Sequence, residues 1–248
     1  MPAALIFDID GTFAETEELH RLAFNQTFSA FGLHWHWDRP LYRKLLAVAG
    51  GKERLAHYVT NYVPQDAGRV DIAALHAAKT SRYAEMVAEG SLCLRPGIAR
   101  LLGEAERLKI PVAIATTTSL PNVETLLQAT LGGEVIEVFA VIGAGDMVSA
   151  KKPAPDVYSY VLDRLGCEGR DCIAFEDSYN GLSAARGAGI PTVVTPSYYT
   201  DTEDFDGALA VLSDLGEPGA PYRHFAGIGD DDRMVTIETL ARWREQHA

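Results

Sequence analysis

The stretch LIFDIDGTFAETEELH, from Leu5 to His20, gives the first indication of the fold. An apolar run of the kind that forms a buried strand ends in two aspartates, Asp8 and Asp10, and Gly11 and Thr12 follow at once. The two carboxylates are two residues apart, so they project to the same side of an extended chain. An acidic turn is the alternative interpretation, because Asp and Gly are common in turns. The rest of the chain has to decide between a turn and a paired-carboxylate site.

Further apolar runs recur along the chain, with helical patterns between them. The predicted strands are Ala4–Asp8, Val112–Thr116, Ala140–Gly143, Cys172–Glu176, Thr192–Thr195 and Ala208–Leu212. They are rich in Val, Ile and Ala without strict alternation, which is typical of strands covered on both faces in a parallel sheet. The predicted helices between them are Pro96–Leu108, Pro153–Leu165 and Gly181–Ala188. This alternation predicts an α/β fold with a doubly wound, Rossmann-like parallel sheet.

One long segment breaks this alternation. Residues 15–94 contain no strand pattern, and instead predict helices at Glu17–Phe31, Asp38–Val48, Glu53–Val63 and Val70–Glu89. We therefore expect an all-helical cap domain, residues 15–94, inserted into a core domain formed by residues 1–14 and 95–248. The stretch from Gly216 to Asp232 is rich in Gly, Pro and Asp and is interpreted as irregular.

The bulk composition excludes several classes of protein. The chain has 248 residues and a net charge of −12, which argues against a nucleic-acid partner because phosphate backbones require a basic face. Three cysteines without CxxC spacing argue against a disulfide framework or a zinc cluster. The first residues lack the basic region of a signal peptide, and no apolar run is long enough to cross a bilayer. We expect a cytoplasmic monomer with no membrane partner.

Chemically active residues follow the predicted strands. In open α/β sheets, ligands bind beyond the carboxyl ends of the strands. The residues there are Asp8 and Asp10 after the first strand, Thr116 at the end of the second, Lys152 after the third, and Glu176 and Asp177 at the end of the fourth. One carboxylate can act as a nucleophile and another as a proton donor. Asp177 with Asp8 and a backbone carbonyl forms an oxygen-only site suited to Mg²⁺, and a lysine with a threonine hydroxyl can hold a phosphoryl group.

These motifs resemble those of the haloacid dehalogenase superfamily of phosphatases with a helical cap. The matching motifs are DIDGT at Asp8–Thr12, Thr116 after VAIA, Lys152 in KKPAPD and EDSYNG at Glu176–Gly181. The resemblance implies that Asp8 forms an aspartyl-phosphate, and that Asp10 protonates the leaving oxygen and then activates water. It implies that Thr116 and Lys152 bind the phosphoryl group. The metal ligands would be Asp8, Asp177 and the Asp10 carbonyl, with Glu176 as a further ligand or a neighbouring acid.

The hydroxyls after Thr116 have a simpler interpretation. Thr118 and Ser119 are interpreted as helix-capping hydroxyls only.

The inserted segment carries candidate substrate contacts. Glu17 and His20 are three residues apart and share a helix face, as do Lys79 and Arg82. The sequence GGKER begins at Gly50, so backbone amides at a helix start could combine with Lys52 and Arg54 in an anion site. A second phosphate, distant from the one cleaved, would suit these cations. For each cation the alternative is a solvated surface charge.

Finer details resemble the CbbY family of Calvin-cycle-associated phosphatases. They are AETEELHR, the WxWD pattern at Trp35–Asp38, GGKER and ATTTSLPNVE. That family removes the 1-phosphate of xylulose 1,5-bisphosphate, an inhibitor of Rubisco. The resemblance implies that a small phosphorylated sugar is contacted by Glu17, Gly50, Gly51, Lys52, Arg54, Lys79, Arg82, Thr117 and Asn122. Phe13 departs from the Leu that most relatives carry after DGT, which is an apolar exchange.

Other functions share parts of this pattern. A mutase resembling β-phosphoglucomutase has the same cap type and every catalytic motif, but carries Ser-Ala-Ser-Lys where this chain has Thr-Thr-Thr-Ser. A non-catalytic sugar-phosphate sensor would need no nucleophile. A dehalogenase would not need Asp10 or the metal acids, and a phosphonatase would need a cap lysine such as Lys52. We expect a Mg²⁺-dependent sugar-phosphate phosphatase.

Overall fold

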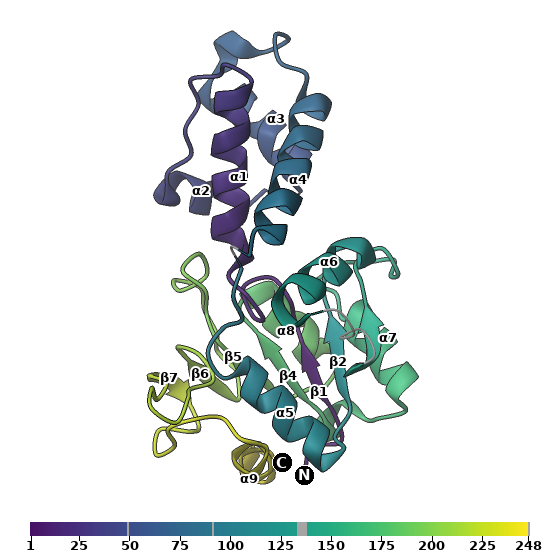
Figure 1. The fold of residues 1–248 in the computed structure, drawn as a ribbon. Coiled ribbons are helices and arrows are strands. Elements are labelled where there is room, and N and C mark those ends of the chain that lie inside the picture. The colour runs from purple at the N-terminus through teal and green to yellow at the C-terminus, as the bar shows by residue number, and fades with distance from the viewer. Residues whose placement is uncertain (49, 91, 133–137, 248) are drawn as a thin grey trace. The chain divides into compact units, whose positions relative to one another are not determined.

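A computed structural model describes residues 1–48, 50–90, 92–132 and 138–247. Contacts divide the chain into two compact units. One, which we call the core unit, comprises Met1–Glu15 and Cys93–Ala248, and the other, the cap unit, comprises Thr16–Leu92 (Figure 1).

The core unit contains a mainly parallel sheet, which confirms the predicted α/β class. Within the described ranges its strands are β1 (Leu5–Phe7), β2 (Val112–Ala115), β3 (Phe139–Gly143), β4 (Ile173–Glu176), β5 (Thr192–Val194), β6 (Ala210–Leu212) and β7 (His224–Gly227). Their order across the sheet is β3-β2-β1-β4-β5-β6-β7, and each pair is parallel except β6 with β7. The first strand in the chain, β1, therefore lies between β2 and β4 near the centre of the sheet.

The helices of the core unit are α5 (Ile98–Leu108), α6 (Leu120–Leu131), α7 (Asp156–Leu165), α8 (Tyr179–Gly187) and α9 (Ile237–His247), with a 3₁₀ turn at Gly169–Asp171. Side chains alternate across β1, so neighbouring residues face opposite sides. Ile6 packs with Val157 and Val161 of α7 in one apolar cluster. Phe7 instead stacks on Phe175 at 4.4 Å between ring centres. Apolar burial on both faces explains why these strands are continuously hydrophobic.

Strand register brings the site residues together. Phe7 of β1 is level with Ile114 of β2 and Phe175 of β4. Since these strands run parallel, the next residues lie level with one another at the strand ends: Asp8 directly after β1, and Ala115 and Glu176 as the last residues of β2 and β4. The DIDGT and EDSYNG motifs, far apart in sequence, are therefore neighbours at one sheet edge.

Two features differ from the sequence prediction. The stretch Gly216–Asp232, interpreted as irregular, contains strand β7, so that interpretation was wrong in part. Phe225, Ala226 and Gly227 of this strand are exposed, so it lacks the continuous apolar run of the central strands. Helices α6 and α9 had no counterpart among the predicted elements.

The cap unit consists of helices in its described residues, as the sequence predicted. They are α1 (Thr16–Ala30), α2 (Arg39–Leu45), α3 (Gly51–Tyr62) and α4 (Ile72–Ala88), with a 3₁₀ turn at Pro64–Asp66. Asp38 and Asp71 cap α2 and α4 by accepting backbone N–H groups of the first turn. An aromatic cluster holds the unit together: Phe24, Phe28, Trp35, Trp37, Tyr42 and Tyr58. Burial of each such ring stabilises the fold by about 1.5–3 kcal/mol.

The insertion leaves and re-enters the core unit at adjacent points. Ala14 forms an antiparallel bridge with Leu94, and the amide of Arg95 donates to the carbonyl of Phe13 at 2.9 Å. The two ends of the insertion are thus tied together within the core unit.

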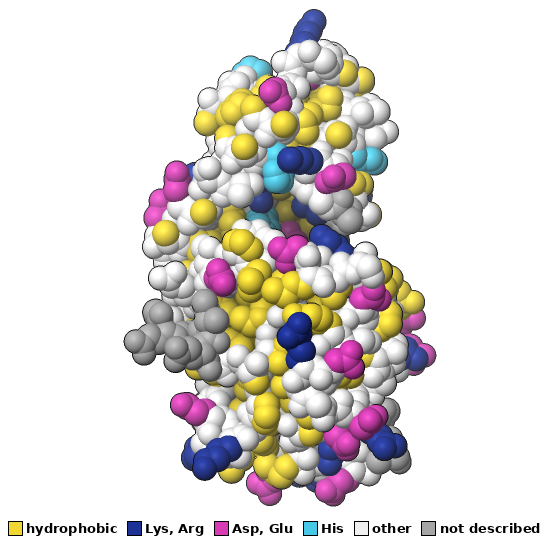
Figure 2. Space-filling view, turned by 90° about the vertical axis from the view of Figure 1, so that its right-hand side faces the viewer, with side chains coloured by type: hydrophobic (Ala, Val, Ile, Leu, Met, Phe, Trp, Pro, Cys, Tyr) yellow, Lys and Arg dark blue, Asp and Glu magenta, His cyan; other side chains and the backbone are white. Residues whose placement is uncertain are grey.

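Charged side chains are dispersed on the face that Figure 2 shows. Lys and Arg are scattered among Asp and Glu there instead of gathering in one broad basic area. Across the described ranges, none of the helices combines the length and the apolar character that crossing a membrane requires.

Candidate active site

Lys152 joins three strands at the carboxyl edge of the sheet. Its Nζ lies 2.6 Å from Asp8 Oδ1, 2.6 Å from Glu176 Oε1 and 2.7 Å from the Ala115 carbonyl oxygen. The lysine side chain is only 5% exposed, so these charge-assisted hydrogen bonds form away from bulk water. The predicted nucleophile and the predicted phosphoryl-binding lysine are therefore in direct contact.

Burial dominates the electrostatics of these carboxylates. It raises the pKa of Asp8 to about 7, because the nearby Glu176 and Asp10 charges add to desolvation and Lys152 offsets only part of it. Burial alone would lower the pKa of Lys152, but Asp8 and Glu176 hold it above its usual value, so the ammonium stays charged. Burial, Asp8 and Glu176 raise the pKa of Asp177 well above its usual value, although Arg95 acts in the opposite direction.

Three acids form a cluster that fits a divalent cation. Asp8, Glu176 and Asp177 are buried, and one carboxylate oxygen of each lies within 4.8 Å of the others. Lysine supplies one positive charge for three carboxylates, and Glu176 Oε2 is buried without a hydrogen-bond partner among the described residues. Oxygen-only donors with surplus negative charge suit a hard ion such as Mg²⁺. The donor set therefore fits the predicted metal.

Two glycines make room for the acids. A Cβ on Gly11 would lie 2.2 Å from Asp177 Oδ2, and a Cβ on Gly181 would lie 1.8 Å from Glu176 Oε2. Gly11 also has φ +84°, a conformation that disfavours other residues. The Gly of DIDGT thus turns the chain and lets Asp177 approach the strand end.

The second aspartate of the motif has a hydroxyl partner. Thr118 Oγ1 donates to Asp10 Oδ2 at 2.5 Å. Thr118 had been interpreted as a helix cap, but the residue at that position of α6 is Ser119, whose side chain makes no capping bond. Thr116 is buried at the end of β2, where its Oγ1 accepts the Thr118 amide at 3.2 Å. The ATTTS stretch therefore links the ends of β2 and β1.

Thr117 and Asn122 lie on the same segment with exposed side chains. Their predicted contact with the sugar stays a prediction.

In the cap unit, two of the predicted residues form a buried pair. Lys79 is 7% exposed, and its Nζ lies 2.8 Å from His20 Nδ1 and 4.8 Å from the centre of the Phe24 ring. Burial and the neighbouring Lys79, Arg54 and His76 lower the pKa of His20 well below its usual value, so the imidazole is neutral and Nδ1 accepts from the lysine.

Glu17 and Arg54 meet at the hydroxyl of Tyr42. That hydroxyl donates to Glu17 Oε2 at 2.8 Å and lies 3.2 Å from Arg54 Nη1. The Arg54 guanidinium also donates to the carbonyls of Leu45 and Val48. Arg54 is thus buried within the cap unit, where it ties α3 to the segment after α2.

The remaining cap residues occupy different environments. Lys52 is exposed in the first turn of α3, and Gly50 precedes that helix with φ +91°. Gly51 lies against His76, where a Cβ would be 2.5 Å from Nε2. Arg82 donates to Gln26 and forms ion pairs with Glu85 and Glu89 on the surface. The predicted GGKER cluster therefore divides into a buried Arg54 and an exposed Lys52.

Arg95 holds loops beside the site, although no sequence pattern predicted this role. Its guanidinium donates to the carbonyls of Thr195 at 2.6 Å, Pro196 at 3.1 Å and Ser213 at 2.9 Å, and also to that of Gly11. One side chain thus fixes the loops after β1, β5 and β6. A single arginine in LRPG carries no pattern that could have indicated this role.

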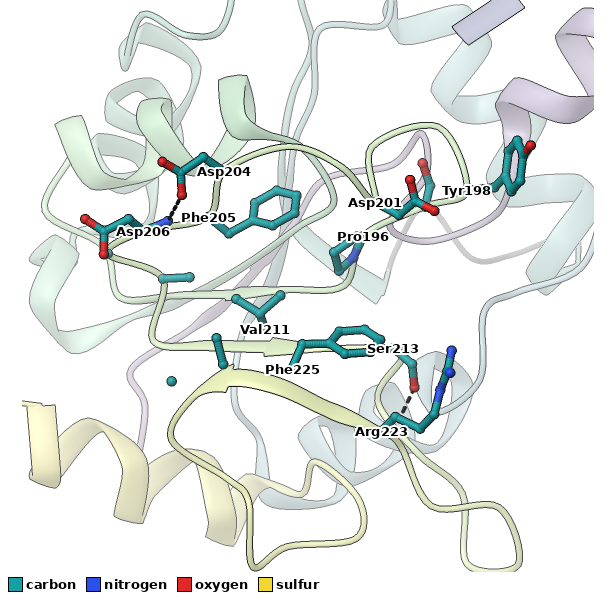
Figure 3. A pocket seen from close by; sticks show the side chains of 15 residues that line it. Pro196, Tyr198, Asp201, Asp204, Phe205, Asp206, Val211, Ser213, Arg223 and Phe225 are labelled. Carbon is teal, nitrogen blue, oxygen red and sulfur yellow. Dashed lines mark hydrogen bonds between the residues drawn. The ribbon is translucent and has the colours of Figure 1, made fainter. Parts of the chain in front are cut away.

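A separate pocket lies at the β6–β7 end of the sheet. It has a volume of about 840 Å³ and lies between the loop 196–208 and strands β6 and β7, with Phe205, Val211 and Phe225 among its walls (Figure 3). None of Asp8, Lys152, Glu176 and Asp177 lines it. The catalytic site is therefore indicated by the converging carboxylates and not by this pocket.

Comparison with known proteins places this geometry in a family. Residues 2–189 match the family of haloacid dehalogenase-like hydrolases. The plasmid protein CbbY of Cupriavidus necator is 52% identical over 245 residues, which cover 97% of this chain and 96% of that protein. The CBBY-like protein of Arabidopsis thaliana is 39% identical over 88% of this chain and 70% of its own length.

Solved structures give the same result. The crystal structure of CbbY from Rhodobacter sphaeroides in complex with phosphate has a TM-score of 0.76 and 50% identity, covering 86% of this chain and 95% of that chain. A mutant of CbbY from the same organism, in complex with xylulose-(1,5)bisphosphate, has a TM-score of 0.76 and 49% identity, covering 88% and 98%. Because the family match spans most of the chain and close relatives cover nearly all of it, this chain belongs to the haloacid dehalogenase-like hydrolases and is a phosphatase.

Proposed function

We propose that the chain is a Mg²⁺-dependent phosphatase that hydrolyses a sugar phosphate, with xylulose 1,5-bisphosphate as the favoured substrate. The observation that carries the proposal is the Lys152 ammonium held 2.6 Å from Asp8 beside the cluster of Asp8, Glu176 and Asp177. The substrate assignment is supported by the CbbY structure that contains xylulose-(1,5)bisphosphate, from a protein 49% identical to this chain.

In the first step, Asp8 acts as the nucleophile. One of its carboxylate oxygens forms a bond to phosphorus while the bond from phosphorus to the sugar oxygen breaks, giving an aspartyl-phosphate. Lys152 neutralises charge on Asp8 and on the transferring phosphoryl group, and the Thr116 hydroxyl contacts a phosphoryl oxygen. Bound Mg²⁺, held by Asp8, Asp177 and the Asp10 carbonyl with Glu176 beside them, would stabilise the negative charge of the transferring group.

Asp10 carries the proton in both steps. It donates a proton to the departing sugar oxygen, and its carboxylate then accepts a proton from the water that attacks phosphorus. The second attack breaks the bond to Asp8 and releases inorganic phosphate. Thr118 orients Asp10 through the 2.5 Å hydrogen bond between its hydroxyl and Oδ2, which keeps that carboxylate beside the strand end.

The test is phosphate release from a panel of sugar phosphates, with Mg²⁺ and with EDTA. We expect fast turnover of xylulose 1,5-bisphosphate, slow turnover of glucose 1-phosphate, and loss of both in EDTA. The Asp8→Asn variant should lose turnover while keeping its circular dichroism spectrum, and Asp163→Asn, which changes an exposed acid on α7, is the matched control. Near-native turnover of Asp8→Asn would exclude the covalent route.

The same panel tests the mutase alternative. Conversion of β-glucose 1-phosphate into glucose 6-phosphate without phosphate release would replace hydrolysis by phosphoryl transfer to a sugar. The 26% identity to a putative β-phosphoglucomutase of Thermotoga maritima, with a TM-score of 0.67, makes this outcome worth measuring.

A further inference from the structure

Tyr158 carries a polar group into the core beside the active site. It lies on α7 and is fully buried in the apolar cluster that contains Ile6, Ala115 and Val161. Its hydroxyl donates to Glu176 Oε1 at 2.5 Å. A phenol in such a place could be a packing residue only, because Tyr is often buried when its hydroxyl finds one partner. Its partner, however, is Glu176, which also binds Lys152 of the site.

Glu176 Oε1 accepts two hydrogen bonds at once. Tyr158 Oη donates to it, and so does Lys152 Nζ at 2.6 Å. Lys152 Nζ also lies 5.2 Å from the centre of the Tyr158 ring, so the phenol contacts both members of the ion pair. On its other side, Oε2 occupies the space where a side chain of Gly181 would begin. The Glu176 carboxylate is therefore fixed from two directions.

This arrangement determines how Lys152 divides its hydrogen bonds. A buried carboxylate is costly unless donors satisfy it, and Lys152 is shared between Glu176 and Asp8. A second donor on Glu176 reduces the pull of that carboxylate on the ammonium. Without the phenol, Lys152 would pair more closely with Glu176 and less closely with Asp8.

We propose that Tyr158 is a positioning residue for phosphoryl transfer: by donating to Glu176 it weakens the pull of that carboxylate on Lys152, and the ammonium therefore stays paired with Asp8. The inference rests on the proposed function and deepens it, because it adds a helix residue to the set that aligns the nucleophile. Tyr158 acts through Glu176 and Lys152 and touches neither the substrate nor the metal.

The first test replaces each of two buried phenols by Phe. Tyr222 is the matched control, because it is 7% exposed and its hydroxyl also makes one 2.5 Å hydrogen bond, to the carbonyl of Gly229 away from the site. Both variants should shift the midpoint of urea unfolding similarly. Tyr158→Phe should lose about tenfold in kcat with KM within about twofold, because alignment of the nucleophile matters in the transition state, whereas Tyr222→Phe should keep kcat.

The second test is a double-mutant cycle with Glu176→Gln. If Tyr158 acts through Glu176, then Tyr158→Phe should cause no further loss of kcat in the Glu176→Gln background, with residual turnover followed at high enzyme concentration. Effects that multiply would overturn the proposal, as would an unchanged kcat in Tyr158→Phe or an equal loss in Tyr222→Phe.

Urea unfolding of the four proteins in this cycle gives a readout that does not depend on the substrate. They are the wild type, Tyr158→Phe, Glu176→Gln and the double variant. The shifts in urea midpoint of Tyr158→Phe and Glu176→Gln should be non-additive, because the two side chains share a buried hydrogen bond. Additive shifts would reject the coupling and leave the proposed function standing. Absence of turnover in the wild-type protein would reject the proposed function and leave the coupling measurable.

Discussion

Substitution of Gly11 by Ala should separate catalysis from folding at the strand end. The new Cβ would lie 2.2 Å from Asp177 Oδ2 and 2.6 Å from its Cγ, where ordinary contacts begin near 3.4 Å. The carboxylate would therefore move by about 1 Å, because the dispersion contact becomes repulsive at such distances. A displacement of about 1 Å in an active site can cost about 100-fold in rate. We expect kcat to fall by about that factor, with weaker Mg²⁺ binding.

The cost to stability should be smaller and separable. Ala at φ +84° would destabilise the fold by about 1–2 kcal/mol through backbone strain. Gly166→Ala is the matched control, since Gly166 has φ +66° in the same unit and its Cβ would meet no atom within 4 Å. Both variants should lose similar stability in urea unfolding, but only Gly11→Ala should lose kcat and Mg²⁺ affinity, the latter measured by calorimetry. Near-native kcat for Gly11→Ala would refute the view that this glycine exists to admit Asp177.

Three other predictions concern the same site. Lys152→Met should lower kcat by about 10²–10³-fold in steady-state phosphate release, because it removes the charge that opposes Asp8, and a loss below about tenfold would contradict that role. Thr118→Val should lower kcat by about tenfold, whereas Thr125→Val, which alters an exposed threonine of α6, should not; equal effects would remove Thr118 from the site. The third prediction is a dependence of stability on pH. Since the pKa of Asp8 is raised from 3.8 to about 7, the metal-free native state keeps a proton that the unfolded state releases. Its unfolding free energy should therefore fall as pH rises between these values, and fall less in Asp8→Asn; Mg²⁺, which favours the carboxylate, should stabilise more at about pH 8 than at about pH 5 in urea titrations. Equal slopes in the two proteins would show that Asp8 is not the titrating group.

Most of the core could be predicted from the sequence, because each buried parallel strand appears there as a short apolar run that ends in polar residues. Buried strands such as β1 and β4 are continuously apolar and end in polar residues, so both the sheet and the meeting of Asp8 with Glu176 follow from the pattern. Strand β7 has no such apolar run, because it is an antiparallel edge strand with exposed residues.

Residues that act through other side chains have no distinguishing pattern in the sequence. Tyr158 lies among the apolar positions of α7 and looks like a core residue, and Thr118 lies where a capping hydroxyl is common. In the cap unit, spacing indicated that Lys79 and Arg82 share a face, yet Lys79 is buried against His20 and Arg82 pairs with Glu85. Spacing along a helix indicates which face a side chain occupies. It does not indicate how deeply that side chain is buried, because burial depends on the helices that pack against it.

The bridge between Ala14 and Leu94 has a consequence for evolution. Because the insertion begins and ends at paired neighbours, any domain with closely spaced termini could replace residues 16–92 without changing a single strand register. Exchange of this one block of sequence would then leave the buried acids and Lys152 of the sheet in place.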